Sequence, residues 1–561
     1  MEFTSQQLIS FVLIWVASFI SVKYFQKLRP HAMYEWLEAF LIAAAGAGLV
    51  VWVLNGIAFN RTLRWLFIIL AYLIILMGFN FIRSKKVKDQ DDMMVAGRSL
   101  SLRVMVFTLI CTWIGSGTFI AGAEFAAKAG WSALWLPAGA WVGIIVIYFL
   151  AAKIRTFGKY TIGDILEVRY GRFARLFGAI ALIISFTAIV SYQFKAGGYI
   201  LNVVSDHQIS VETGQFLAAL FVILFTATAG MIAVAYTDLP NGIIILLACL
   251  IATPIVVYNA GGAAAMQSLP ADHLKVINQQ FGQFPVLKAV SYFLATMLLL
   301  MGVQSMYQKF YSAKTPKDAR TAVSLWVIGT IFVETVVVII AVFAAAKFWP
   351  QIKAFLDGDR ANGMDPASIV IQAAKNLVPP YVGILLIAAA CAVVISTGMN
   401  YLLSPTTNIM RDIYQQFINP TADQRRMVVL QKLIIVAIGV VAYLLCTKLK
   451  SVLEMSYFAY TIYGVAITPA LLAALAWRRA TRAGGLASIV SGSLVALGLY
   501  VAGFLWPSIM VPYGDPNGDP FGIPLIYPAF LVSIVTLVGV SLLTKPPKPS
   551  EIAPLFGDNQ G

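Results

Sequence analysis

Residues 389–414, AACAVVISTGMNYLLSPTTNIMRDIY, begin as an apolar segment and continue with regularly spaced polar side chains. From Ser396 onward most of the spacings are three or four residues, so at about 3.6 residues per turn these side chains form one stripe on a helix. A polar group that faces hydrocarbon without a partner costs several kcal/mol. We therefore expect the stripe either to form hydrogen bonds that hold neighbouring membrane helices together or to line a transport path. It comprises Ser396, Thr397, Asn400, Ser404, Thr407, Asn408 and Arg411.

The composition of the whole chain indicates a membrane protein. Its 561 residues are 60% hydrophobic and only 12% charged, with a mean hydropathy of +0.82, whereas about a quarter of a soluble domain is charged. Long apolar runs recur along the sequence, and we expect an all-α polytopic protein with about fifteen transmembrane helices. The first run, residues 7–24, has no cleavage site and is expected to stay in the mature protein.

The basic residues predict an orientation. A net charge of +15 would suggest nucleic acid for a soluble protein, but here every basic cluster falls on the same side of the predicted helices, as the positive-inside rule requires. We expect a plasma (inner) membrane protein with its N-terminus outside, its C-terminus cytoplasmic and no nucleic-acid partner. The clusters are Lys23–Arg29, Arg83–Lys88, Lys153–Arg175, Lys309–Arg320, Arg425–Arg426, Arg478–Arg482 and Lys545–Lys548.

Glycines predict interruptions in two of the helices. In TWIGSGTF, Gly115 and Gly117 bracket Ser116, and a second apolar segment, 284–308, contains Gly302. Glycine in mid-helix costs about 1 kcal/mol relative to alanine, so both places are expected to unwind. Two broken helices five segments apart are typical of an inverted repeat with a binding site near the bilayer midplane. The alternative is that these glycines only allow helices to pack closely.

Six stretches together resemble the sodium:solute symporter family, which includes sodium-coupled glucose, proline, pantothenate and sialic acid carriers. They are DDMMVAGRSLS, CTWIGSGTFIAGAEFAAKAGW, YTIGDILEVRYG, MYQKFYSAKTPKDAR, ISTGMNYLLSPTTNIMRDIY and WRRATRAGG. The resemblance implies a LeuT-type fold with two inverted five-helix repeats plus peripheral helices. It also implies alternating-access import of a small solute coupled to Na+ in a lipid membrane. We accordingly expect two additional N-terminal helices in residues 1–60, the symporter domain in 61–545 and a short cytoplasmic tail in 546–561.

The resemblance also implies a first sodium site, built where the first core helix unwinds and where the eighth core helix passes it. By motif, the carbonyl ligands fall on Cys111, Ile114 and Val393, and the hydroxyl ligands fall on Ser396 and Thr397. The last three residues share one helical face, which fits a common ligand.

A second sodium, found in some members of the family, would lie deeper toward the cytoplasm against Asp238. Asn400, one turn beyond Ser396, is expected to contribute an oxygen. Against this second site, Asp238 lies at the edge of the predicted helix 239–258, where an acid also suits a helix N-terminus. Met399 stands where the family has a further hydroxyl.

The expected substrate pocket departs from that of the sugar carriers, because Leu299 replaces their aromatic gate and Thr296 replaces a sugar-binding asparagine. Lys195 matches a position where sialic acid carriers have a carboxylate-binding arginine. A cation at that depth costs at least about 3 kcal/mol unless it is paired or hydrated. We therefore expect a small organic anion as solute, with Thr118 and Gln193 nearby.

Several alternatives remain open at the level of sequence. Lys195 snorkels to an interface or pairs with Glu124, and the solute is then a neutral sugar, polyol or amino acid. A proton-coupled carrier would use Asp238, a membrane sensor would need more than the short tail after Lys545, and an enzyme would need a catalytic constellation that we do not find. The sequence indicates neither the identity of the solute nor the oligomeric state.

Overall fold

The computed structural model describes residues 61–84, 89–228, 230–279, 281–448, 451–511 and 519–556. Within these residues, eleven helices are long and apolar enough to cross a membrane. The all-helical membrane fold is therefore confirmed, whereas the predicted number of about fifteen spans is not. The spans predicted at 7–24 and 37–58, and with them the two additional N-terminal helices, lie outside the described residues.

The first half of the described chain runs from α3 to α13. It contains α3 (Arg61–Ser84), α4 (Gln90–Val95), α5 (Leu102–Trp113), the π-helical η2 (Gly117–Gly122), α6 (Ala123–Ala129), α7 (Trp135–Phe157), α8 (Ile162–Tyr170), α9 (Arg172–Val204), α10 (Val211–Thr228), α11 (Met231–Ala260), α12 (Pro285–Gly302) and α13 (Gln304–Ser312). The segment between α11 and α12 carries two short 3₁₀ helices, Gly262–Ser268 and Ala271–Leu274.

The second half runs from α14 to α23. It contains α14 (Pro316–Leu356), α15 (Ile369–Asn376), α16 (Pro380–Asn408) with its π-helical continuation η7 (Ile409–Ile418), α17 (Gln424–Cys446), α18 (Val452–Ala466), α19 (Thr468–Ala476), α20 (Arg482–Leu505), α21 (Pro507–Met510), α22 (Ile526–Leu543) and α23 (Pro549–Phe556).

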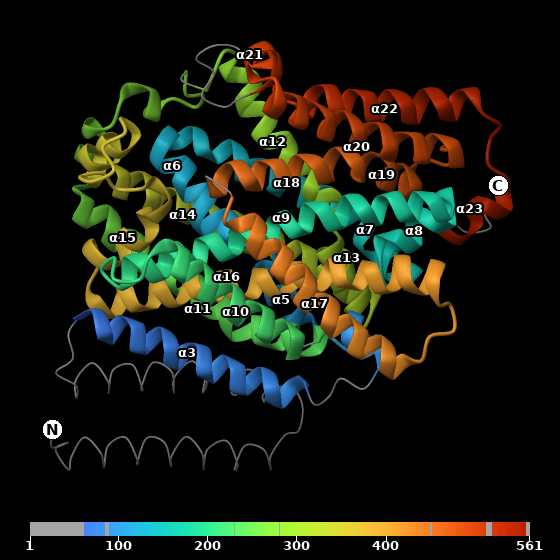
Figure 1. The fold of residues 1–561 in the computed structure, drawn as a ribbon, viewed down its shortest axis with the longest axis horizontal. Helices are drawn as coiled ribbons and strands as arrows, with labels where there is room; N and C mark the ends of the chain where they lie inside the picture. The colour runs from blue at the N-terminus through green and yellow to red at the C-terminus, as the bar shows by residue number, and fades with distance from the viewer. Residues whose placement is uncertain are drawn as a thin grey trace.

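The polar stripe of α16 lies in the middle of the bundle. In Figure 1, α9 and α16 run through the centre, with α3 along one side and α20 and α22 along the other. In the most apolar stretch of α16 with η7, 89% of the residues are buried, whereas only 22% are buried in the corresponding stretches of α17 and of α20. This difference follows from the chemistry of the side chains, because the polar stripe of α16 needs polar partners from other helices. The outer helices expose apolar side chains such as Val440 and Leu494, which can face lipid.

Both predicted helix interruptions are confirmed. After α5 ends, Ile114 has an extended backbone with φ −69° and ψ 91°, and after α12 ends, Val303 has φ −69° and ψ 119°. The glycines also bring helices close together. A Cβ atom on Gly117 would lie 2.4 Å from the Tyr460 hydroxyl, and one on Gly302 would lie 2.5 Å from Thr468 Oγ1. Unwinding and close packing, weighed as alternatives from the sequence, thus occur together at neighbouring residues of both breaks.

One predicted boundary is wrong. The sequence predicts a helix over 239–258, but α11, which contains these residues, already begins at Met231, and α10 ends before it at Thr228. Gly230, with an extended backbone, caps α11, and the helix continues through Pro240. Asp238 therefore lies two turns inside α11 and is fully buried, so an interaction with the helix N-terminus, which is limited to the first turn, does not explain it.

A buried network of charges closes one end of the bundle, where α7 ends and α9 begins; we call it the basic end. Arg175 of α9 pairs with Asp412 of η7 at 2.6 Å, with Asp164 of α8 at 2.9 Å and with Glu167. Asp412 also accepts hydrogen bonds from Thr161 at 2.8 Å and from Asn408 at 2.6 Å. The Arg175 side chain is only 1% exposed, and the network joins α8, α9 and η7 through direct contacts.

The substitution Arg175→Met tests the contribution of this network to stability. It leaves Asp412 and Asp164 buried without their cation, which should lower the free energy of unfolding by roughly 3–5 kcal/mol. The measurement is thermal unfolding of the purified protein in detergent. The control is Arg172→Met, since Arg172 is exposed three residues earlier on the same helix and should change stability by less than about 0.5 kcal/mol. Equal melting temperatures for the two variants would show that the network contributes nothing.

Candidate functional site

Oxygen atoms of α5 and α16 gather at the break after α5. Thr397 Oγ1 lies 3.0 Å from the Cys111 carbonyl oxygen and 3.3 Å from the Ile114 carbonyl oxygen, and Ser396 Oγ lies 3.4 Å from the Cys111 carbonyl oxygen. Val393 is buried one turn before Thr397 on the same helix. Cys111, Ile114, Ser396 and Thr397 are therefore brought together as neutral oxygen donors, whereas the ligand role of Val393 stays a prediction.

Gly115 makes this approach possible. A Cβ atom at Gly115 would lie 2.7 Å from Cγ2 and 2.8 Å from Oγ1 of Thr397, which is closer than van der Waals contact. Ser396 is fixed from the opposite side, because its hydroxyl donates a hydrogen bond to Oδ1 of Asp238. A hydroxyl that gives its proton to a carboxylate keeps its lone pairs for another partner, so Ser396 is oriented as an acceptor toward the break.

A second polar cluster surrounds Asp238, between α5, α11 and α16. Asp238 Oδ2 accepts from Thr108 Oγ1 at 2.5 Å and from Asn400 Nδ2 at 3.2 Å. The Lys309 ammonium of α13 donates to Oδ1 of Asn400 and is fully buried. The sequence groups Lys309 with the basic cluster Lys309–Arg320 on one side of the membrane, whereas its side chain is buried between the helices. A signal of this burial is that Lys309 directly follows the predicted broken segment 284–308.

A third group of polar side chains faces the same break from α9 and α18. Gln193 Oε1 accepts from the Ser116 hydroxyl at 2.6 Å and from the Ser116 backbone N–H at 3.2 Å. Its Nε2 atom, a hydrogen-bond donor, is buried with no partner in the described part of the chain. The hydroxyl groups of Tyr192 and Tyr460 lie 3.1 Å apart. Gln193 thus contacts the unwound segment through Oε1 and keeps a buried N–H group without a partner in the described part of the chain; its place near a solute stays a prediction.

Glu334 on α14 lies on the other side of the unwound segment and was missed by sequence analysis. Oε1 accepts from the indole N–H of Trp113 at 2.8 Å, Oε2 accepts from that of Trp141 at 2.7 Å, and the Thr118 hydroxyl also hydrogen-bonds to this carboxyl. Indole groups can only donate, so both carboxyl oxygens of Glu334 act as acceptors in these contacts. A single carboxylate in the middle of a long apolar helix is by itself a signal of function.

The remaining predicted substrate residues lie farther from this group. Thr296 Oγ1 donates to the Leu136 carbonyl oxygen at 2.6 Å, so it joins α12 to α7. Leu299 is completely buried in the core, and Gly464 of α18 packs against its backbone, since a Cβ atom there would lie 3.5 Å from Leu299 N. Both residues sit in packed helix contacts.

Lys195 is 7% exposed, and the acidic groups that act on it are the Cys446 thiol and the carboxyl groups of Asp365, Glu124 and Glu454. These groups lie in or near the loops at the end of the bundle opposite the basic end. Asp365 belongs to the loop between α14 and α15, where burial raises the pKa of its carboxyl group. The structure therefore places Lys195 toward this opposite end, with its role in solute binding still a prediction.

The end near Lys195 is also closed by polar contacts. Glu124 of α6 accepts a hydrogen bond from the Ser451 hydroxyl at 3.0 Å and one from the Leu453 backbone N–H at 3.4 Å. Lys128 pairs with the same carboxylate at 2.7 Å. The contacts of Glu124 join the first turn of α6 to the first turn of α18.

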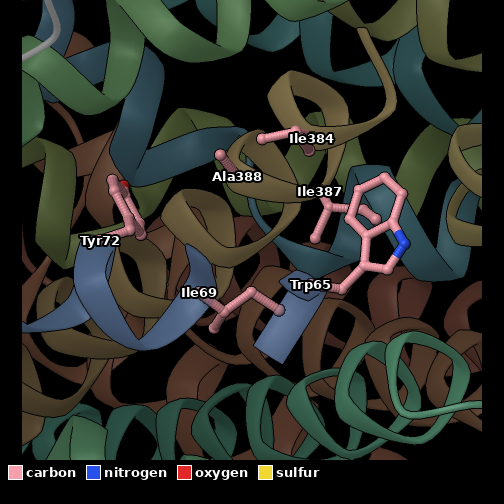
Figure 2. Close-up of a pocket in the computed structure, with 6 residues that line it drawn as sticks. All are labelled: Trp65, Ile69, Tyr72, Ile384, Ile387 and Ala388. Atoms are coloured by element: carbon pink, nitrogen blue, oxygen red, sulfur yellow. The ribbon is translucent and has the colours of Figure 1, made fainter. Parts of the chain in front are cut away.

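A crevice between α3 and α16 is a different feature. Figure 2 shows that it is lined from α3 and α16 by side chains that are almost wholly apolar. Its polar groups are the indole N–H of Trp65 and the Tyr72 hydroxyl, which donates to Asn241 Oδ1 at 2.7 Å. The crevice is therefore an apolar feature with few groups that could bind a polar solute. The lining residues are Trp65, Ile69, Tyr72, Ile384, Ile387 and Ala388.

Comparison with known proteins identifies relatives along most of the chain. The family model described as "Sodium:solute symporter family" matches residues 93–492. The osmoregulated proline transporter OpuE of Bacillus subtilis (strain 168) is 28% identical over 508 residues, which cover 87% of this chain and 96% of the relative. The high-affinity proline transporter PutP of the same strain is 26% identical, with coverage of 85% and 97%. A sodium/proline symporter of Staphylococcus aureus is 25% identical, with coverage of 85% and 92%.

Solved structures show the same fold. A Na+-coupled sialic acid symporter, in a substrate-bound outward-open state, superposes with a TM-score of 0.70 at 16% identity, covering 86% of this chain and 97% of that one. Mhp1, a nucleobase-cation-symport-1 family transporter, superposes with a TM-score of 0.52 at 11% identity, covering 82% and 97%. At these identities the likeness concerns the arrangement of helices and not the solute.

Proposed function

The chain belongs to the sodium:solute symporter family, and from this premise we propose that it imports a small zwitterionic amino acid together with sodium by alternating access. Sodium is the coupling ion of the family. The observation that carries the choice of solute is the pair of groups on either side of the unwound segment. Gln193 presents a free N–H donor there, and Glu334 presents a carboxylate.

These groups are complementary to the two ends of an amino acid. A buried N–H donor without a partner favours an acceptor such as the solute's carboxylate, because an unsatisfied donor costs about 1–3 kcal/mol. The start of η2 at Gly117 also favours negative charge. The Glu334 carboxylate favours the solute's ammonium group. Three relatives of the chain are described as transporters of proline, a small zwitterion, which supports the same class.

The first sodium, in this proposal, is held by the oxygens at the break after α5. The carbonyl groups of Cys111, Ile114 and Val393 and the hydroxyl groups of Ser396 and Thr397 are its ligands. Neutral oxygen donors suit a monovalent cation, and Asp238 orients the Ser396 hydroxyl by accepting its proton. The basic end faces the cytoplasm of a plasma membrane, as the positive-inside rule requires, with the N-terminus outside.

The driving force is sufficient for a solute without net charge. One inward charge at a membrane potential of 100 mV is worth about 2.3 kcal/mol, and a tenfold sodium gradient adds about 1.4 kcal/mol. Together these support roughly 500-fold accumulation with one sodium. A monoanion would cancel the electrical part at one-to-one stoichiometry, so a zwitterion uses the gradient more fully.

A small organic anion bound by Lys195 is the second candidate. It is favoured by the burial of this lysine on the helix that also carries Gln193. A neutral sugar or polyol finds less support, since Thr296 and Leu299 lie in packed helix contacts. The two candidates differ in which charged residue meets the solute, and they can be separated by substitution.

The substitution Thr397→Ala tests the sodium site. It removes one ligand oxygen, so the sodium concentration for half-maximal uptake in proteoliposomes should rise roughly 10- to 100-fold, the range seen for lost metal-site contacts. The control is Thr226→Ala, which removes a buried hydroxyl that bonds only to its own helix, at Val222, and should leave sodium dependence unchanged. A well-folded Thr397→Ala protein with the parental sodium dependence would exclude Thr397 as a ligand.

The substitution Glu334→Gln tests the proposed solute class. The assay measures sodium-driven uptake of L-proline and its inhibition by two analogues. Pyrrolidine lacks the carboxylate of proline, and cyclopentanecarboxylate lacks its amine. Loss of a charged hydrogen bond should weaken proline uptake about 10- to 100-fold, while sodium binding survives. The variant should also discriminate less against cyclopentanecarboxylate. Glu212→Gln, on the exposed start of α10, is the control and should transport normally.

The substitution Lys195→Gln tests the second candidate. If the solute is an organic anion held by this lysine, the variant should lose high-affinity uptake of that anion, and Lys195→Arg should keep part of it because the charge remains. Uptake assays with a panel of carboxylic acids and amino acids measure the effect. Parental affinity in Lys195→Gln, together with a loss in Glu334→Gln, would leave the amino acid as the solute.

A further inference from the structure

The cluster around Asp238 contains a complete pair of opposite charges. In the described part of the chain, the hydrogen-bond partners of the Asp238 carboxylate are donors, namely the hydroxyls of Thr108 and Ser396 and the amide of Asn400. Lys309 Nζ donates to acceptors, Asn400 Oδ1 and, at 3.0 Å, the sulfur of Met231. These partners match a carboxylate anion and an ammonium cation.

Asn400 connects the two charges and its orientation is fixed by them. A carboxylate can only accept, so the amide nitrogen must face Asp238, and an ammonium can only donate, so the amide oxygen must face Lys309. A sodium ion beside Asp238 would therefore meet the N–H side of Asn400 instead of its oxygen. In this arrangement the amide cannot serve as the sodium ligand that the sequence suggested.

The cluster would otherwise suit a small cation. A carboxylate, two hydroxyls and an amide oxygen are the hard oxygen donors that such ions prefer, and here they are fully enclosed by α5, α11 and α16. Lys309 brings a positive charge to the same place on a tether from α13. Because Asp238 and Lys309 are both fully buried, each would be left uncompensated without the other.

We propose that the Lys309 ammonium is a built-in counter-cation of Asp238 that takes the place of a second sodium, so that each chain binds and moves a single sodium ion. The remaining sodium binds at the break after α5. Since α13 follows the second interrupted helix directly, this tethered charge also keeps α13 against α16 when the sodium leaves.

The test counts bound sodium, with no solute present. The probe is ²²Na+, titrated to saturation on the purified full-length chain. We expect one ion per chain for the parent protein and for Lys309→Arg, which keeps the charge. Lys309→Met removes the charge while retaining an unbranched side chain, and should bind two ions. The double variant Lys309→Met/Asp238→Asn should return to one.

Two results would overturn the proposal. The first is two sodium ions per parent chain, a number that needs no variant and therefore decides the matter even if Lys309→Met does not fold. The second is a single ion of unchanged affinity in a folded Lys309→Met protein. Because the assay contains no solute, its outcome does not depend on whether the transported molecule is an amino acid.

Discussion

The hydrogen bond from Ser396 to Asp238 is the contact on which the central part of the structure depends. It joins α16 to α11, while the neighbouring Thr397 hydroxyl reaches the carbonyl groups at the end of α5. In an apolar bundle none of these groups has water as an alternative partner, so each must be satisfied by another helix. This constraint turns a stripe of small polar side chains into the junction of three helices.

The proposed sodium and solute sites share one short piece of backbone. Cys111 and Ile114 end α5 on the sodium side, and Ser116 and Thr118 continue on the solute side, where they contact Gln193 and Glu334. A ligand that orders one half of this segment also orders the other half, because only a few residues of backbone separate them. Such sharing is a physical basis for coupling the binding of ion and solute.

The two ends of the bundle are closed by different kinds of contact. At the basic end, Arg175 is surrounded by buried carboxylates. At the opposite end, Glu124 accepts hydrogen bonds from the start of α18. Alternating access requires that these closures open in turn, and the second, with fewer charges and a partly exposed Lys128, costs less to break.

The sequence by itself determined the membrane class, the two broken helices, the family and the residues gathered at the break after α5, because hydropathy, glycine position and local motifs are properties of short segments. It did not locate the start of α11, where an apolar run continues through Gly230 without a clear stop, and so it misjudged the surroundings of Asp238. Only the tertiary structure showed that Glu334 meets Trp113 and Trp141, and that Lys309 turns inward to Asn400. These contacts join residues far apart in the chain, and whether a lone charge faces lipid, water or a partner depends on the packing of helices that no single segment encodes.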